Sequence, residues 1–207
     1  MSAKPFSIAI VCPLLLMIAG CAKVRYPNYY TLSIAPAMTA DATVASRPIT
    51  VGVRRFETPA YLRQGRIVYS EAPGKIGFYE YHRWAVEPGA AVTTAVIESI
   101  RSGRLFSVVE PYDGHDRPDY LITGRLERLD EIDYGGEVKV EARISAELVN
   151  LRTGSVVWTG DADGTSKVDR REVDTVVAEM SHALQGSISQ LLTGMERQVP
   201  EAQVSSR

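Results

Sequence analysis

The alternation of apolar and polar positions is clearest over residues 138–148, where it runs without interruption. Such one-sided alternation predicts an antiparallel strand with one face in the core and the other in water. Gly135-Gly136 before this strand and Thr153-Gly154 after it are turn signals. We therefore expect a meander of three strands, in which residues 120–126 and 156–158 flank the central strand.

Shorter segments rich in β-branched and aromatic residues predict the remaining strands. These segments are residues 29–34, 49–56, 66–69, 76–81 and 106–109. Pro73-Gly74 is a turn signal between the third and the fourth of them. In the strand that begins at Tyr120, Leu129 falls on the opposite parity to Leu126, which predicts a β-bulge or the end of the strand.

Two segments have a helical period instead. After Pro88, which suits the first turn of a helix, apolar residues recur every fourth position up to Ile100, and Gly103 is a natural stop. A second apolar stripe consists of Val173, Val176, Val177, Met180, Leu184, Ile188, Leu191, Leu192 and Met195. This stripe is wide, so we expect it to pack on a sheet rather than to form a coiled-coil dimer. The order of elements predicts an α+β fold: an antiparallel or mixed β-sheet with two helices packed on one face.

The first twenty residues have the pattern of an export signal. Lys4 precedes an uncharged and mostly apolar stretch, residues 6–19. As a helix this stretch would span about 21 Å, which is short of the ~30 Å hydrocarbon core of a bilayer. We therefore predict a signal peptide and not a transmembrane helix.

The end of this signal, Ile18-Ala19-Gly20-Cys21, resembles the bacterial lipobox, with Ile where Leu is commonest. On this interpretation Cys21 becomes the first residue of the mature protein and carries a covalent lipid that anchors the protein to a membrane. The alternative is an ordinary signal peptide with a chance cysteine. Ala22 stands where an aspartate commonly retains lipoproteins in the inner membrane, so we expect the outer membrane, with inner-membrane retention as the alternative.

The composition is that of one ordinary globular domain with short extensions. The 207 residues are 45% hydrophobic and 23% charged, and the formal net charge is -2. A nucleic-acid partner is not expected, because nucleic-acid-binding domains usually carry a clustered positive excess. We divide the chain into a lipoprotein signal peptide (1–20), a lipidated tether (21–27), a single domain (28–196) and a disordered tail (197–207).

Candidate catalytic and metal-binding groups are few. The histidines His82, His115 and His182 are far apart in the sequence and lack a metal-ligand spacing. Residues 161–164 resemble part of a calcium loop without its later ligands, so we expect a turn at the end of a strand. We therefore predict a protein that is not an enzyme and that needs no metal and no cofactor, apart from the covalent lipid on Cys21.

A cluster of carboxylates lies close to the Gly135-Gly136 turn. Asp130, Glu131 and Asp133 are one or two residues apart. One interpretation is a paired-carboxylate site for acid–base chemistry. We favour the simpler interpretation, in which water solvates these side chains at the tip of the hairpin.

Aromatic and basic residues gather in residues 79–84, just before the first predicted helix. These residue types often anchor interfaces, so one interpretation is a contact surface for a partner or for a lipid headgroup. The alternative is a strand with one face in the core and with Trp84 covering the start of the helix. The candidate partner-binding residues are Tyr29, Tyr30, Tyr79, Tyr81, Arg83 and Trp84.

An ordered set of segments is similar to the ABC-type transport auxiliary lipoproteins, the family of the paraquat-inducible protein C-like proteins. The set comprises Cys21, residues 29–32, 49–53, 59–62, 66–68 and 81–88, Asp119-Tyr120 and Val157-Trp158. The resemblance covers nearly the whole mature chain, and identifies residues 28–196 as the auxiliary lipoprotein domain. The polar stretch 38–47 departs from the family pattern.

The resemblance implies a non-enzymatic accessory role beside an ABC permease, its ATPase and an MCE-domain protein. Such systems move lipids or other hydrophobic molecules between the two membranes of a bacterial envelope. The expected partners are therefore the MCE-domain protein, the membrane that holds the lipid anchor, and a second copy of the chain if the protein is a homo-oligomer. The alternative function is that of a regulatory lipoprotein in envelope assembly or peptidoglycan synthesis.

Overall fold

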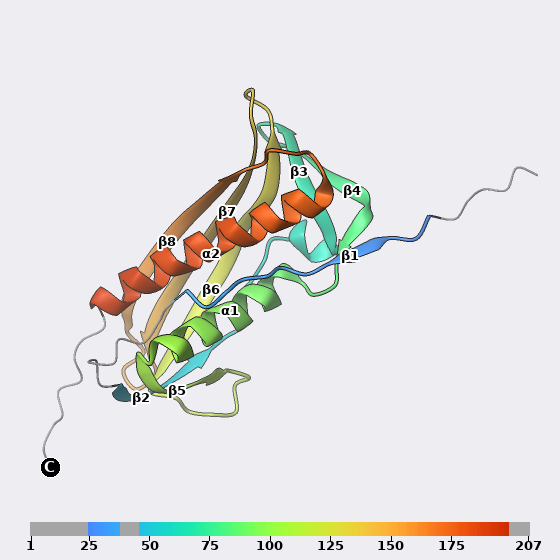
Figure 1. Cartoon of the computed structure of the whole chain (residues 1–207). Helices are drawn as coiled ribbons and strands as arrows, with labels where there is room; N and C mark the ends of the chain where they lie inside the picture. The colour runs from blue at the N-terminus through green and yellow to red at the C-terminus, as the bar shows by residue number, and fades with distance from the viewer. Residues whose placement is uncertain (1–24, 38–45, 199–207) are drawn as a thin grey trace, which may run out of the picture.

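The computed structural model describes residues 25–37 and 46–198, and it confirms the α+β fold (Figure 1). Its strands are β1 (Asn28–Tyr30), β2 (Arg47–Val53), β3 (Arg66–Ala72), β4 (Lys75–Trp84), β5 (Phe106–Pro111), β6 (Tyr120–Asp133), β7 (Val138–Asn150) and β8 (Val156–Lys167). Its helices are α1 (Pro88–Gly103), α2 (Val173–Gln198) and a short 3-10 helix (Leu62–Gln64).

The long strand β6 is the centre of an eight-stranded mixed sheet. One edge of β6 pairs with β7 in antiparallel register, and β8 follows β7. The other edge is shared by two parallel strands, with β2 beside the first half of β6 and β3 beside the second half. Beyond them, β5 extends the sheet next to β2, while β4 and then β1 extend it next to β3.

Both helices lie on the same face of the sheet, as the sequence predicts (Figure 1). The first begins at Pro88 and ends at Gly103, and Arg104 then adopts a left-handed conformation with φ 51°. The second buries its apolar stripe against β7 and β8. Among the described residues, no helix has the length and apolar character needed to cross a bilayer.

The predicted irregularity in β6 is a β-bulge. The register with β7 shifts between Leu126 and Arg128, so that Leu126 and Leu129 both point to the core although their parities differ. The bulge also turns the next odd position, Glu131, to the helix side of the sheet. Strand β7 alternates as predicted, and its core positions from Val140 to Leu148 are buried.

Strand β8 corrects one prediction. Residues 161–164 are not a turn at the end of a strand, because β8 continues through them to Lys167. The helix-facing positions after Trp158 are small: Gly160, Ala162 and Gly164. A Cβ placed at Gly164 would lie 2.0 Å from the carbonyl oxygen of Ala183, so α2 approaches too closely for larger side chains. The small residues remove the hydrophobic alternation by which a strand is recognised.

The N-terminal segment corrects a second prediction. Of the expected strand 29–34, only Tyr29 and Tyr30 pair with the sheet, as part of β1, and the following residues run between α1 and α2 (Figure 1). There, the backbone N–H of Ser33 donates to the Ser181 hydroxyl at 3.1 Å, and that of Ala37 donates to the Ser99 hydroxyl at 2.9 Å. Serine hydroxyls therefore replace the strand partner that this segment lacks.

Several predictions fall outside the described residues. These are the signal peptide, the lipobox with Cys21, most of the tether and most of the polar stretch 38–47. Helix α2 extends to Gln198, two residues into the predicted tail, and the remainder of that tail is also outside.

Candidate functional site

Pairing of β1 with β4 brings the two predicted aromatic segments together. The strands are parallel, with Asn28, Tyr29 and Tyr30 opposite His82, Arg83 and Trp84. The N–H of Ala85 donates to the carbonyl of Tyr30 at 2.8 Å and closes the pair. Residues more than fifty positions apart therefore form one edge of the sheet, and strand alternation gives this edge two different faces. The register of β4 with β3 shifts between Phe78 and Arg83, so Tyr79 lies on the same face as His82, and Tyr81 and Arg83 lie on the other.

The face turned toward the helices carries a polar cluster around one buried carboxylate. Glu131 of β6 is 0% exposed, and its Oε2 accepts a hydrogen bond from the Tyr79 hydroxyl at 2.5 Å. The Arg171 Nε lies 3.4 Å from Glu131 Oε1, which has no hydrogen-bond partner. The Tyr30 hydroxyl and the His82 Nδ1 are 2.9 Å apart, and the His82 ring meets the edge of the Tyr79 ring. We call these five residues the Glu131 cluster.

Burial sets the protonation chemistry of this cluster. Loss of solvation first, and then the hydrogen bond to Glu131, raise the pKa of the Tyr79 phenol above its ordinary value. Burial and a neighbouring carboxylate, Asp174, likewise raise the pKa of Tyr30. Both phenols are therefore held in the neutral form, in which each can donate a hydrogen bond. The arrangement stabilises a buried charge and offers no nucleophile paired with a base.

Trp84 belongs to the core rather than to an exposed surface. Its side chain is 6% exposed and packs in the main hydrophobic cluster. The alternative interpretation of this segment is therefore correct for Trp84. Tyr79 is half-buried and directs its hydroxyl to Glu131, so most of its ring is also inaccessible.

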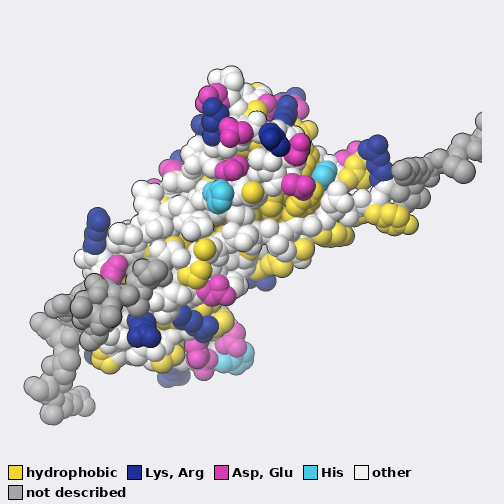
Figure 2. Space-filling view, viewed as in Figure 1, with side chains coloured by type: hydrophobic (Ala, Val, Ile, Leu, Met, Phe, Trp, Pro, Cys, Tyr) yellow, Lys and Arg dark blue, Asp and Glu magenta, His cyan; other side chains and the backbone are white. Residues whose placement is uncertain are grey.

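The opposite face of the edge is partly open to solvent, with Tyr29 exposed and with Tyr81 and Arg83 half-buried. We call Tyr29, Tyr81 and Arg83 the β1–β4 surface. Tyr29 is 64% exposed, and strand alternation places Arg83 beside it. The guanidinium of Arg25 lies over the Tyr81 ring at 5.6 Å, and Tyr26, next in the chain, is 81% exposed. Figure 2 shows hydrophobic side chains, a class that includes tyrosine there, gathered around β4 and along the N-terminal arm.

The carboxylates near the β6–β7 turn are not all solvated, which corrects the favoured interpretation. Asp130 is 2% exposed and Glu131 is 0% exposed, because β3 pairs with this half of β6. Asp130 accepts hydrogen bonds from Ser70 and from Arg128, at 2.5 and 2.6 Å. Adjacent strand residues point to opposite faces, so the two carboxyl groups do not form an acid–base pair.

Sequence reasoning missed Glu131 and Arg171 as functional neighbours of the aromatic segment. Their juxtaposition depends on the β-bulge in β6 and on the path of the chain into α2, and neither is a local property. One local signal was present for Asp130: Arg128 stands two residues earlier on a strand, and side chains at that spacing share a face.

The remaining candidates are placed as isolated surface groups. His115 lies beside Asp113 in a loop, and His182 lies beside Glu179 on the exposed side of α2. Asp163 pairs with Arg143 on the outer face of the sheet at 2.5 Å. In residues 25–37 and 46–198 no cluster of three or more His, Cys, Asp or Glu residues is arranged to hold a metal ion.

The outer face of the sheet contains an open hollow of about 710 Å³. Its lining is mainly charged or small and includes Glu57, Arg125, Arg143, Glu147 and Asp161. Sites for hydrophobic ligands are lined mostly by apolar and aromatic side chains. This hollow therefore does not suit an acyl chain.

Comparison with known proteins agrees with this architecture. No curated protein matches the chain. Protein XCC0632 from Xanthomonas campestris, a DUF330 protein, has the same fold, with a TM-score of 0.72 and 16% identity over 83% of this chain and 97% of that one. An uncharacterized protein aligns with a TM-score of 0.60 and 15% identity over 84% of this chain and 99% of that one.

The comparison with family models extends over most of the chain. The model of the ABC-type transport auxiliary lipoprotein component matches residues 30–192, from the end of β1 into the last turns of α2. This range includes α1, most of α2 and every strand from β2 to β8. The chain therefore belongs to the ABC-type transport auxiliary lipoprotein family.

Proposed function

We propose that this protein is a non-enzymatic accessory of an MCE/ABC system that moves lipids or other hydrophobic molecules between membranes. In this proposal the lipid on Cys21 holds the domain on the periplasmic face of the outer membrane. The transport machinery then docks on the domain from the periplasm. The family match over residues 30–192 is the observation that carries the proposal, because it covers the folded domain and names a transport accessory.

The length of the tether supports docking rather than shuttling. The first residue of β1, Asn28, is seven positions after Cys21. A fully extended chain of that length spans at most about 25 Å. An anchored domain would therefore stay close to its membrane, and a partner would have to reach it there. The polar lining of the hollow on the sheet points the same way, because it does not suit a lipid carried as cargo.

We place the partner contact on the β4 side of the edge, at Tyr81 and Arg83. These are the candidate residues that β4 turns away from the Glu131 cluster and the core. Aromatic and arginine side chains carry much of the binding free energy at protein interfaces. Tyr30, Tyr79 and Trp84 would support this contact from behind, through packing and hydrogen bonds.

Co-purification tests the proposal directly. The tagged full-length lipoprotein should capture the MCE-domain protein from detergent-solubilised envelopes, together with lipid. Replacing Arg83 by Gln or Tyr81 by Ala should weaken capture by ~1–4 kcal/mol of binding free energy without lowering the melting temperature. Leu151→Ala, an exposed apolar position in the β7–β8 turn, is the matched control. Unimpaired capture by both surface variants would place the partner elsewhere, and no capture by the parent protein would contradict the transport role.

The anchor is tested at Cys21. Cys21→Ser removes the thiol that would accept the diacylglycerol, so the precursor should stay uncleaved by the lipoprotein peptidase and unacylated. Metabolic labelling with a fatty acid, followed by membrane fractionation, measures both effects. Recovery of a mature, acylated Cys21→Ser protein would show that the lipobox assignment is wrong.

A further inference from the structure

Two residues at the start of the described chain, Arg25 and Tyr26, lie close to the proposed anchor. Arg25 is four residues after Cys21, and Tyr26 follows it. A fully extended chain of four residues spans about 14 Å. If Cys21 carries the lipid, these side chains are therefore held within the depth of a headgroup layer and its immediate surface, whatever path the tether takes.

These two residues and Tyr29, on the neighbouring strand β1, have the chemistry of a membrane interface. Tyr26 is 81% exposed and Tyr29 is 64% exposed, the two highest values among the exposed large hydrophobic side chains of the described chain. Tyrosine is enriched where a bilayer meets water, because its ring is apolar and its hydroxyl is polar. The guanidinium of Arg25 lies 5.6 Å from the centre of the Tyr81 ring, and because the Arg25 side chain is exposed, a lipid phosphate could still reach it.

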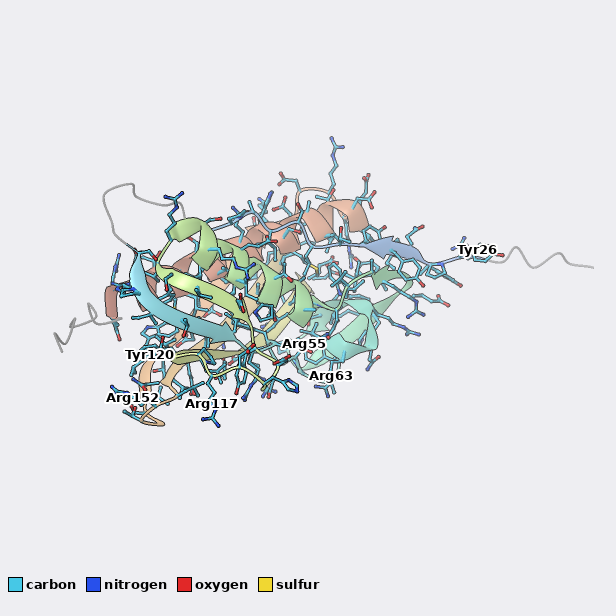
Figure 3. All side chains as sticks on the ribbon, turned by 90° about the horizontal axis from the view of Figure 1, so that it is seen from below. Tyr26, Arg55, Arg63, Arg117, Tyr120 and Arg152 are labelled. Carbon is cyan, nitrogen blue, oxygen red and sulfur yellow. The ribbon has the colours of Figure 1, made fainter. Side chains whose placement is uncertain are left out.

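The fold holds Tyr29 in a defined position. Tyr29 is fixed by the pairing of β1 with β4, and the following residues are fastened between the helices by Ser181 and Ser99. The elements behind Tyr29 therefore form a rigid base. Figure 3 shows Tyr26 at one end of the molecule, with Tyr120 and Arg152 at the opposite end.

We propose that Arg25, Tyr26 and Tyr29 seat this end of the domain in the headgroup layer of the bilayer that holds the lipid anchor. The inference rests on the proposed lipidation of Cys21 and extends it from a flexible tether to a two-point attachment. A lipid chain alone leaves a domain free to tumble, whereas interfacial side chains on a rigid base fix its orientation. The end that carries Tyr120 and Arg152 then faces away from the membrane, and Tyr81 and Arg83 lie at the rim where a protein partner can reach them.

Quenching by brominated lipid tests this orientation. The purified full-length lipoprotein is reconstituted in vesicles of phosphatidylcholine and phosphatidylglycerol, with bromine placed on the acyl chains near the headgroup. Tyr26→Trp and Tyr29→Trp each add an indole at the proposed interface. Val156→Trp, at a 51% exposed apolar position in the strand that follows Arg152, is the matched control. The native Trp84 and Trp158 are buried, and the parent protein measures their background.

The added indoles at positions 26 and 29 should lose most of their emission in brominated vesicles, and the one at position 156 should not. Arg25→Gln should reduce the loss at position 29 in vesicles that contain phosphatidylglycerol. Equal emission in brominated and plain vesicles for a protein that stays vesicle-bound would overturn the docking and leave the anchor intact. If the emission of the indoles at positions 26 and 29 changes only when the MCE-domain protein is added, the docking on lipid would also be overturned, in favour of a protein contact. Failure to associate with vesicles at all would contradict the anchor, and with it this inference.

Discussion

The two sides of the sheet, β7–β8 and β3–β4, bury different kinds of side chain beneath the layer of helices. Where α2 covers β7 and β8, the core consists of apolar side chains and of small residues such as Gly164, which let the helix come close. Where β3 and β4 flank the second half of β6, the helix side contains Glu131, a carboxylate with 0% exposure. The first end is stabilised by packing, and the second by a hydrogen-bonded network.

This difference shows that the region that stabilises the fold by apolar packing and the region that supports the β1–β4 surface are different parts of the sheet. At the packed end the buried polar side chains of α2, Ser181 and Ser187, donate to carbonyl oxygens of their own helix. A network such as the Glu131 cluster offsets the cost of a buried charge with Tyr79 and Arg171. It also holds β4 in place, so that the alternate residues of this strand can face outward. The two exposed large aromatic side chains of the described residues, Tyr26 and Tyr29, lie at the end with the network.

The largest expected effect is at the packed end. Leu184 of α2 is 0% exposed, so Leu184→Ala should lower the free energy of unfolding by about 2–5 kcal/mol through lost burial and a cavity. Urea unfolding followed by circular dichroism measures the change. Leu184→Met keeps the volume and should cost less than ~1.5 kcal/mol. Equal losses for the two variants would mean that packing does not dominate here.

The network should respond to the loss of one hydroxyl. Tyr79→Phe keeps the ring but leaves the buried Glu131 carboxylate without its 2.5 Å hydrogen bond. A bond to a charged group contributes about 1.5–3 kcal/mol, and the same urea titration should show a loss of that order. Tyr29→Phe removes an exposed hydroxyl and is the control. No change for Tyr79→Phe would show that Arg171 alone holds the charge.

Because α2 lies so close to β8, even the single methyl group of an alanine at position 164 should lower the stability of the fold. Gly164→Ala places a Cβ 2.0 Å from the Ala183 carbonyl oxygen, so β8 and α2 must move apart. Overpacking of this kind costs about 1–3 kcal/mol. Thermal unfolding measures it, with Gly186→Ala as the control, because a Cβ there meets no atom within 4 Å. An unchanged melting temperature for Gly164→Ala would show that α2 is not tightly packed against β8 at this position.

Alkaline pH should weaken the network before it weakens the apolar core. The folded state raises the pKa of Tyr79 above its usual value of 10.0, so the unfolded chain releases this proton first as the pH rises. The stability that this phenol contributes is complete below about pH 10 and is lost as the pH rises toward the raised pKa. Between pH 8 and 11, the urea concentration at the midpoint of unfolding should decrease less steeply with pH for Tyr79→Phe than for the parent protein. Parallel slopes would remove Tyr79 from the alkaline response.

The smallest stability effect is expected on the β1–β4 surface. Tyr29 is 64% exposed, so Tyr29→Ser should change the free energy of unfolding by no more than ~0.5 kcal/mol. A surface role and a core role therefore make opposite predictions for this tyrosine. A loss as large as that of Tyr79→Phe would make Tyr29 part of the network.

Much of the fold could be predicted from the sequence, where periodicity reflects direct burial. The alternation in β7, the stripe of α2 and the Pro88 start of α1 each report one face packed on the core, and all three are confirmed. The second half of β8 could not be predicted, because its helix-facing residues are small rather than hydrophobic. The site was foreseen in part: Tyr29 and Arg83 do meet, but through a parallel pairing that no local pattern encodes.

The sequence by itself determined the family, the α+β class and the candidate aromatic segments, because these depend on residue types and their spacing. The tertiary structure alone decided which of the aromatic residues are accessible. Trp84 enters the core, Tyr79 turns to Glu131, and Tyr29 stays in solvent, although all three are large aromatic side chains in strands. Burial of a side chain depends on what packs against its strand face from elsewhere in the chain. Here that is set by the β-bulge in β6 and by the helices, which no single segment specifies.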